Sequence, residues 1–379
     1  MGVKIYWMII VAVIILGLIM PQKGYYKKYY VILMAGLHTF VCGFRYMYLT
    51  GDLIKYSNGY NFYYENPGIS WVSETVFNGG RNAGFEWMKK AFALITHGDF
   101  QIFLIVLAII AEVGLAILIY RYSPKPWLSY LVWNCMGFFI TYDFCAIKQG
   151  LAMSILVFAM ICILEKKPIG FLVLTLLAGF VHMPALVFLP AYWLMGRKVN
   201  VKTIVTYVIT AGLIFIFRDS IVQFLQDIYY AGNDEVNFVL QSDHLGGRFI
   251  VILLMIFAGA ALKGFREKDF AGIFNIMIVA AILQMFSGYD NVFTRFADYY
   301  LQFAVLYIPM IFYKLEYNVA LDQNASVPIL QFNSKSIRLI VLFVTLILIW
   351  WYWKTQLGIT ITYETDNYLN FRFMWDVAS

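Results

Sequence analysis

The chain has 379 residues, of which 62% are hydrophobic and only 13% are charged, with a formal net charge of +6. Soluble domains carry about 25% charged residues, so this composition excludes an ordinary soluble protein and indicates an integral membrane protein. The basic residues stand in short clusters between apolar runs, which is typical of membrane topology and argues against a nucleic-acid-binding surface. The four cysteines have neither metal-ligand spacing nor the pattern of a disulfide framework.

The apolar runs predict the number of membrane spans, because an α-helix needs about 20 residues to cross a bilayer. Suitable runs lie at residues 5–20, 29–44, 100–120, 127–142, 144–164, 202–217, 249–265, 271–288, 297–313 and 338–353. With two short helices expected in the segment 168–195, the predicted fold is all-α: a polytopic integral membrane protein of about 12 helices. We expect residues 1–379 to form a single transmembrane domain.

The clusters of lysine and arginine between these runs predict the orientation of the chain. They are Lys23, Lys27 and Lys28; Arg121 and Lys125; Lys166 and Lys167; Arg197, Lys198 and Lys202; Lys263, Arg266 and Lys268; and Lys314, Lys335 and Arg338. Placing every cluster in the cytoplasm satisfies the positive-inside rule. The two long loops, 45–98 and 218–248, are then predicted to face outward, as are the N-terminus and the C-terminal tail.

The segment 168–195 is too short for two full spans, although both of its flanks are predicted to be cytoplasmic. Two spans would need about 40 residues, so we expect a hairpin of two short helices, with a break between Gly179 and Pro184. Non-helical backbone at membrane depth is tolerated only beside protein or a water-filled cavity. The hairpin therefore predicts a cavity, with His182 near its tip.

The outer loop 45–98 ends in a predicted amphipathic helix. Phe85, Met88, Phe92 and Ile95 fall on one helical face, so we expect this helix to lie on the outer membrane surface.

Ionisable residues in or near membrane spans are costly to bury and are therefore functional candidates. On the predicted outer side these are Arg45, Asp52, Lys148, His182, Arg218, Arg248 and Arg295. Guanidinium groups bind phosphate oxygens bidentately, so the arginines suit a diphosphate. Each residue also has a plainer interpretation. Arginines at span ends often only reach the headgroups, the histidine suits a hydrogen-bonded core residue, and Asp52 suits a turn. Glu112, well inside the third span, suits helix packing as well as it suits catalysis.

Several catalytic motifs are absent from the sequence: it has no P-loop, no His-Glu-x-x-His and no serine-nucleophile elbow. No Asp-x-Asp pair occurs either, which argues against a metal-bound nucleotide-sugar site. We expect neither a cofactor nor a metal.

Short motifs spread over most of the chain resemble the EpsG/Wzy-like family of bacterial polysaccharide polymerases. They are Gly-Phe-Arg-Tyr with the following Gly-Asp (43–52), Gly-Phe (84–85), Ile-Lys-Gln-Gly-Leu-Ala (147–152), Val-His-Met-Pro-Ala-Leu (181–186) and Arg-Phe with the following Tyr-Tyr (295–300). The family usually has arginine where this chain has Lys148, and lysine keeps the charge but lacks the bidentate fork.

This resemblance implies a metal-independent, inverting glycosyltransferase with a GT-C-like membrane fold, making capsule, exopolysaccharide or O-antigen. Donor and acceptor would be undecaprenyl-diphosphate-linked oligosaccharides, joined at the outer face of the bacterial cytoplasmic membrane, with a flippase and a chain-length regulator as further partners. Arg295 and Arg45 would hold the diphosphate, supported by Lys148, Arg218 and Arg248. The proton of the acceptor hydroxyl would pass to His182 or Asp52, and the sequence does not choose between them.

Two other functions fit the same composition. A flippase or transporter of the same lipid-linked sugars would be expected to show two similar halves, whereas this chain has unequal outer loops and no visible repeat. A ligase resembling the O-antigen ligases would share the donor site and differ only in its acceptor pocket. A membrane acyltransferase is a weaker alternative, because its histidine would have to meet a cytoplasmic donor.

Overall fold

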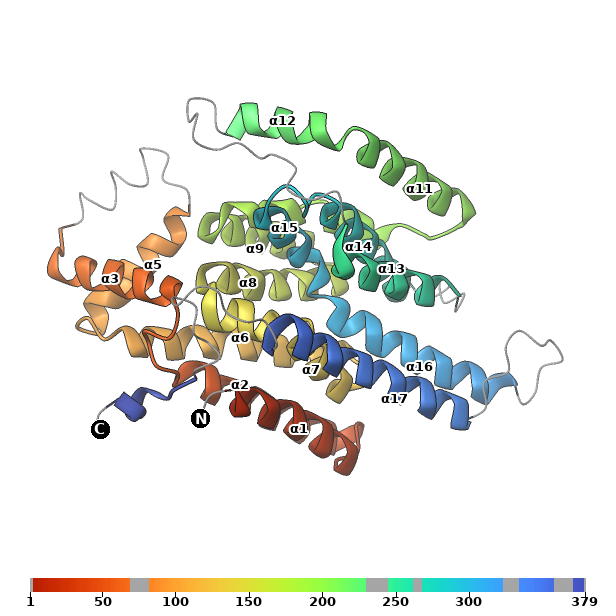
Figure 1. The fold of residues 1–379 in the computed structure, drawn as a ribbon, viewed down its shortest axis with the longest axis horizontal. Coiled ribbons are helices and arrows are strands. Elements are labelled where there is room, and N and C mark those ends of the chain that lie inside the picture. Colours follow the sequence, from red (N-terminus) through yellow and green to blue (C-terminus); the bar gives the residue numbers. More distant parts are fainter. Residues whose placement is uncertain are drawn as a thin grey trace. The chain divides into compact units, whose positions relative to one another are not determined.

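A computed structural model describes residues 3–68, 82–229, 245–261, 268–322, 334–357 and 371–377. The chain forms two compact units, Met1–Leu186 with Ile308–Ser379, and Val187–Tyr307. Regular structure in the described ranges is helical throughout, apart from one isolated antiparallel bridge between Arg45 and Phe373 (Figure 1). The predicted all-α fold is therefore confirmed.

The first unit contains most of the long apolar helices. Its elements are α1 (Lys4–Ile19), α2 (Gly24–Gly43), α3 (Gly51–Glu65), α5 (Ala83–Ile95), α6 (Phe100–Tyr122), α7 (Pro126–Cys135), the π-helical turn η1 (Phe139–Cys145), α8 (Ile147–Leu164), α9 (Pro168–Val181), most of α16 (Ala304–Asp322), α17 (Ser334–Tyr352), the π-helical turn η4 (Trp353–Leu357) and the 3-10 turn η6 (Met374–Val377). Local signals set several boundaries. The Asp99 side chain accepts hydrogen bonds from the first backbone N–H groups of α6, and a proline opens each of α7 and α9.

The second unit is built from shorter helices. They are α10 (Ala191–Gly196), α11 (Val201–Ile216), α12 (Arg218–Tyr229), α13 (Gly246–Ala261), α14 (Lys268–Gln284) and α15 (Asn291–Leu301). Val222, Phe286, Tyr289 and Phe293 form a buried apolar cluster between α12, α15 and the turn after α14. Residues 230–244 of the predicted outer loop 218–248 lie outside the described residues.

Three helices in the described part of the chain are individually long and apolar enough to cross a membrane: Phe100–Tyr122, Ile147–Leu164 and Leu339–Leu357. The bent pair α11 and α12 supplies a fourth if it counts as one span, and several apolar helices of 10–17 residues accompany them. These helices confirm a polytopic membrane protein. The predicted span 127–142 is interrupted: α7 ends at Cys135, Gly137 has φ +84°, and the chain continues as η1.

The chain between α9 and α10 breaks where the sequence predicts it. α9 ends at Val181, and a 3-10 turn, η2 (Met183–Phe188), follows His182. A Cβ atom added at Gly179 would lie 2.3 Å from Leu186 Cδ2, so the chain after the break folds back over the last turn of α9. That the whole segment 168–195 forms a membrane hairpin stays a prediction.

In the described part of the predicted outer loop 45–98, α3 and α5 pack against each other. The Lys89 ammonium lies 2.9 Å from Glu86 Oε2 and 5.3 Å from the centre of the Tyr63 ring. Only 5% of Lys89 is exposed, so the charged group lies inside this pair of helices. Whether α5 lies on the membrane surface stays a prediction.

Candidate functional site

Three of the basic clusters predicted to be cytoplasmic, those at 23–28, 121–125 and 166–167, meet at one end of the first unit. Lys27 Nζ donates to the Ser123 carbonyl at 2.7 Å, and Glu165 accepts from both Arg121 (2.5 Å) and Lys167 (2.6 Å). The hydrogen bond from Lys167, with the charge of Arg121, holds the pKa of the Glu165 carboxyl below its usual value. These contacts join the start of α2 to the ends of α6 and α8.

Most of the first unit's candidate site residues belong to segments at the opposite end of these helices. Gln101 Nε2, at the start of α6, donates to the carbonyl of Gly43 at the end of α2 (2.6 Å). The Met183 backbone N–H, just after α9, donates to Asn82 Oδ1 at the start of α5 (3.2 Å). The segments at this end carry Arg45, Asp52 and His182.

Arg45 is the most deeply buried charge of this end, with 1% of its surface exposed. Its guanidinium lies 5.0 Å from the centre of the Phe144 ring, and Nη1 donates to the Cys42 carbonyl. Among the described residues, Nε and Nη2 have no hydrogen-bond partner. The C-terminal segment 371–377 is paired with the Arg45 backbone through the bridge to Phe373. The arginine is therefore an enclosed cation with two unsatisfied donor nitrogens, as an anion-binding group requires.

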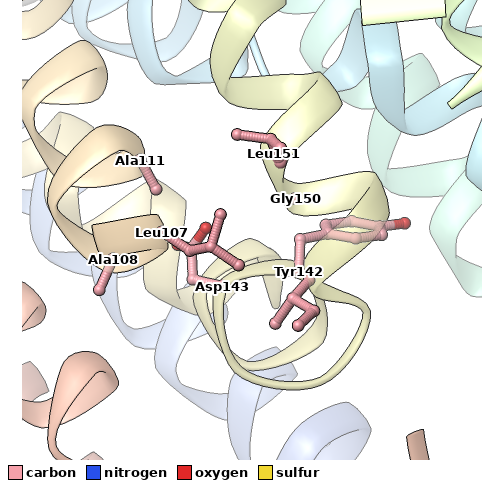
Figure 2. A pocket seen from close by; sticks show the side chains of 8 residues that line it. Leu107, Ala108, Ala111, Tyr142, Asp143, Gly150 and Leu151 are labelled. Carbon is pink, nitrogen blue, oxygen red and sulfur yellow. The ribbon is translucent and has the colours of Figure 1, made fainter. Parts of the chain in front are cut away.

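Asp143 lies beside Arg45 and lines a small cavity. Its carboxylate accepts a hydrogen bond from Trp133 Nε1 at 3.1 Å and is within electrostatic range of the Arg45 guanidinium. Cys42 Sγ donates to the Asp143 carbonyl (2.9 Å), which ties η1 to α2. The cavity measures about 10 Å³, room for about one water molecule. Figure 2 shows its lining residues, which come from α6, η1 and the start of α8: Leu107, Ala108, Ala111, Tyr142, Asp143, Ile147, Gly150 and Leu151.

Glu112 is a second buried carboxylate near this cavity. It is 1% exposed, and neither of its oxygens has a hydrogen-bond partner among the described residues. Twelve residues separate it from Phe100, so it lies about 18 Å along α6 from the start of that helix. It is within electrostatic range of Asp143. Two carboxyl groups and one guanidinium thus share an apolar interior, where unpaired charge is costly.

The other candidates of the first unit lie in three different local settings. His182 is half-buried and forms the C-cap of α9, where its backbone N–H donates to the Ala178 carbonyl at 2.8 Å. Asp52 lies in the first turn of α3, where a carboxylate is favoured by the helix dipole. Lys148 lies in the first turn of α8, one residue after the cavity-lining Ile147. All three side chains are partly exposed.

The second unit holds the remaining arginines. Arg295 is exposed on α15, and the buried Asp298, one turn further along the same helix, forms an ion pair with Arg248 of α13. The Arg218 guanidinium lies 6.0 Å from the centre of the Tyr289 ring. The structure therefore connects α13 with α15 through Arg248, and it assigns Arg218 to the start of α12.

Sequence reasoning missed the residues that complete the setting of Arg45. Neither Asp143 nor Trp133 is among the candidates that the sequence predicts. Their roles depend on contacts between distant segments, since Cys42 and Asp143 are 101 positions apart. One signal was available: an acidic residue between two apolar runs is unusual enough to be a candidate by itself.

The comparison with known families agrees with the short motifs. A model of the EpsG family matches residues 28–372, which is most of the chain. The chain belongs to the EpsG family. The matched range includes every candidate site residue named above, and EpsG membership supports a role of the polysaccharide-polymerase kind. No curated protein and no solved structure matches the chain significantly.

Proposed function

We propose that this EpsG-family protein is a polysaccharide polymerase that joins undecaprenyl-diphosphate-linked repeat units at the outer face of the cytoplasmic membrane. The family match over residues 28–372 carries the proposal. The enclosed Arg45 cation supports it, because a guanidinium with two unsatisfied nitrogens suits a diphosphate group. The meeting of three of the predicted cytoplasmic basic clusters at the other end of the first unit agrees with an outward site.

The proposed reaction is a displacement at the anomeric carbon of the donor sugar. The bond between that carbon and the diphosphate oxygen breaks, and the electron pair leaves with the diphosphate. The acceptor hydroxyl oxygen forms the new glycosidic bond with inversion, and its proton passes to His182 or Asp52. Arg45 and Arg295 bind the diphosphate and stabilise the negative charge that develops as it leaves, a contribution of about 3–4 kcal/mol for a well-placed donor.

Purified protein in liposomes, supplied only with its undecaprenyl-diphosphate repeat unit, tests the activity. A ladder of products spaced by one repeat supports a polymerase. Transfer of a single finished chain to another acceptor supports a ligase, and movement of labelled lipid between leaflets without a ladder supports a flippase. Either of the last two results would overturn the proposal.

Alanine variants then test the site residues. Arg295→Ala and His182→Ala should abolish the ladder while the protein is produced at the normal level. Arg121→Ala is the matched control, because Arg121 lies at the opposite end of the first unit with a half-exposed side chain. Full-length polymer from both site variants would refute the assignment.

A further inference from the structure

A long apolar groove runs along the outside of the first unit between α2 and α6. It has a volume of about 510 Å³, within the range of about 300–1,000 Å³ that is typical of ligand sites. Thr39 is the only polar residue in its lining, and no lining residue is charged. Its walls are Ile32, Ala35, Gly36, Thr39, Phe40 and Phe44 of α2 with Ile109, Val113, Ala116 and Ile117 of α6.

The groove exists because the two helices touch at one end and leave space further along. At Gly43 an added Cβ would lie 3.3 Å from the Ile105 Cα, so α2 and α6 are in close contact there. At Gly36, two turns earlier, an added Cβ would meet nothing within 4 Å. Small side chains at Ala35 and Ala116 deepen the same hollow. Small residues thus create the space, which lies between the apolar stretches of α2 and α6.

The shape and chemistry of the groove fit a single hydrocarbon chain. From Ile32 to Phe44 it extends over about 18 Å of helix, which is more than half of the roughly 30 Å hydrocarbon core of a bilayer. The apolar lining excludes a sugar or a headgroup along its length.

One end of the groove adjoins the candidate site. Phe44 lines the groove, and the next residue is Arg45. Its ring and that of Phe40 lie about 6 Å from Trp375, with centroid separations of 6.2 Å and 6.1 Å, and tryptophan favours the membrane–water interface. A chain lying in the groove would therefore place its polar end beside the backbone of Arg45, whose positive charge is complementary to a diphosphate.

We propose that the α2–α6 groove binds the polyprenyl chain of the lipid-linked substrate, with the diphosphate end at Phe44 and Arg45. This rests on the proposed function for the identity of the lipid. The groove binds the hydrocarbon chain, and Arg45 supplies the positive charge for its diphosphate. Bulk phospholipid is the competing occupant, and it would show no preference for this groove over other lipid-facing surfaces.

Photo-crosslinking tests whether the polyprenyl chain binds in the α2–α6 groove, and it does not require turnover. Undecaprenyl diphosphate with a diazirine in its hydrocarbon chain should label peptides of α2 and α6 in the full-length protein in liposomes. Excess unlabelled undecaprenyl diphosphate should remove the label, whereas excess phosphatidylglycerol should not. Equal competition by the two lipids, or labelling spread evenly over the apolar helices, would overturn the proposal.

Two substitutions fill the groove from opposite walls. Gly36→Leu projects into open space and should reduce labelling at least fivefold, and Ala116→Leu from α6 should do the same. Gly212→Leu on α11 is the matched control, because Gly212 is also an exposed helical glycine with nothing within 4 Å of an added Cβ. It should leave the labelling unchanged. Full labelling of both groove variants would overturn the proposal.

The polymer assay separates this inference from the proposed function. Groove-specific labelling without a product ladder would refute the proposed polymerase activity but support polyprenyl binding in the groove. A product ladder with no labelling of α2 and α6 would refute only the proposed polyprenyl binding in the groove. With both confirmed, Gly36→Leu should lower turnover of the full-length lipid substrate more than that of an analogue whose chain is too short to reach Gly36.

Discussion

The substitution Gly150→Ala tests the packing beneath the candidate site. An added Cβ would lie 2.4 Å from the Tyr142 carbonyl oxygen and 2.9 Å from its carbon, both of them backbone atoms of η1. Ordinary contact begins at 3.4 Å, so η1 must move by about 1 Å. Overpacking of this kind costs about 1–3 kcal/mol. Alanine regains about 0.5–1 kcal/mol through its higher helix propensity, which leaves a central net loss of about 1 kcal/mol, within a range of roughly 0–2.5 kcal/mol.

Thermal unfolding in detergent measures the stability term, and the liposome ladder measures its effect on the site. Because Asp143 follows Tyr142 directly, a shift of η1 should also displace the carboxylate beside Arg45 and reduce polymer formation. Gly212→Ala is the control: its Cβ meets nothing, so it should be neutral or slightly stabilising. A Gly150→Ala protein as stable and as active as the parent would refute this packing.

Three further changes have defined outcomes. Arg45→Met removes the positive charge that acts on the buried Asp143 carboxyl and should lower the unfolding temperature; adding Asp143→Asn should recover part of the lost thermal stability, and no recovery would refute the coupling. Arg248→Met should lower the unfolding temperature by stranding the buried Asp298, and Asp298→Asn in the same chain should restore it. The pKa of Glu165 is lowered in the folded protein, so its stabilising effect is present at neutral pH and lost as pH falls through the folded pKa. The stability difference between the parent and Glu165→Gln should therefore shrink on acidification, and a difference that is constant with pH would contradict this.

The helices that the sequence predicted best are those whose boundaries depend on local signals. The runs at 100–120 and 144–164 correspond to α6 and α8, and the break near His182 lies where Gly179 and Pro184 predicted it. The run at 127–142 was predicted as one span, but the chain turns at Gly137, where φ is +84°. Hydropathy averages over such a turn, because the residues on both sides of it are equally apolar.

The candidate site was only partly predictable, because its key contacts are long-range. The type of residue identified Arg45 as a candidate, but its burial depends on Phe144 and on Phe373, which is more than 300 positions away. No periodicity in α2 could have indicated either contact. Arg45 and Arg295 were predicted to act together, and they belong to different units of the structure. Their joint role stays a prediction that only the activity of the variants can test.

The cost of the buried charges is itself an argument for function. Three ionisable side chains, those of Arg45, Asp143 and Glu112, are buried among residues that are mostly apolar. Two of them, Arg45 and Glu112, have polar atoms without hydrogen-bond partners among the described residues. A protein selected for stability alone would gain by replacing such groups with hydrophobic residues of similar volume. The unsatisfied N–H groups of Arg45 need hydrogen-bond acceptors, which the oxygens of an anionic ligand can supply. A polyprenyl diphosphate meets both requirements of this region, since its head is anionic and its chain is apolar.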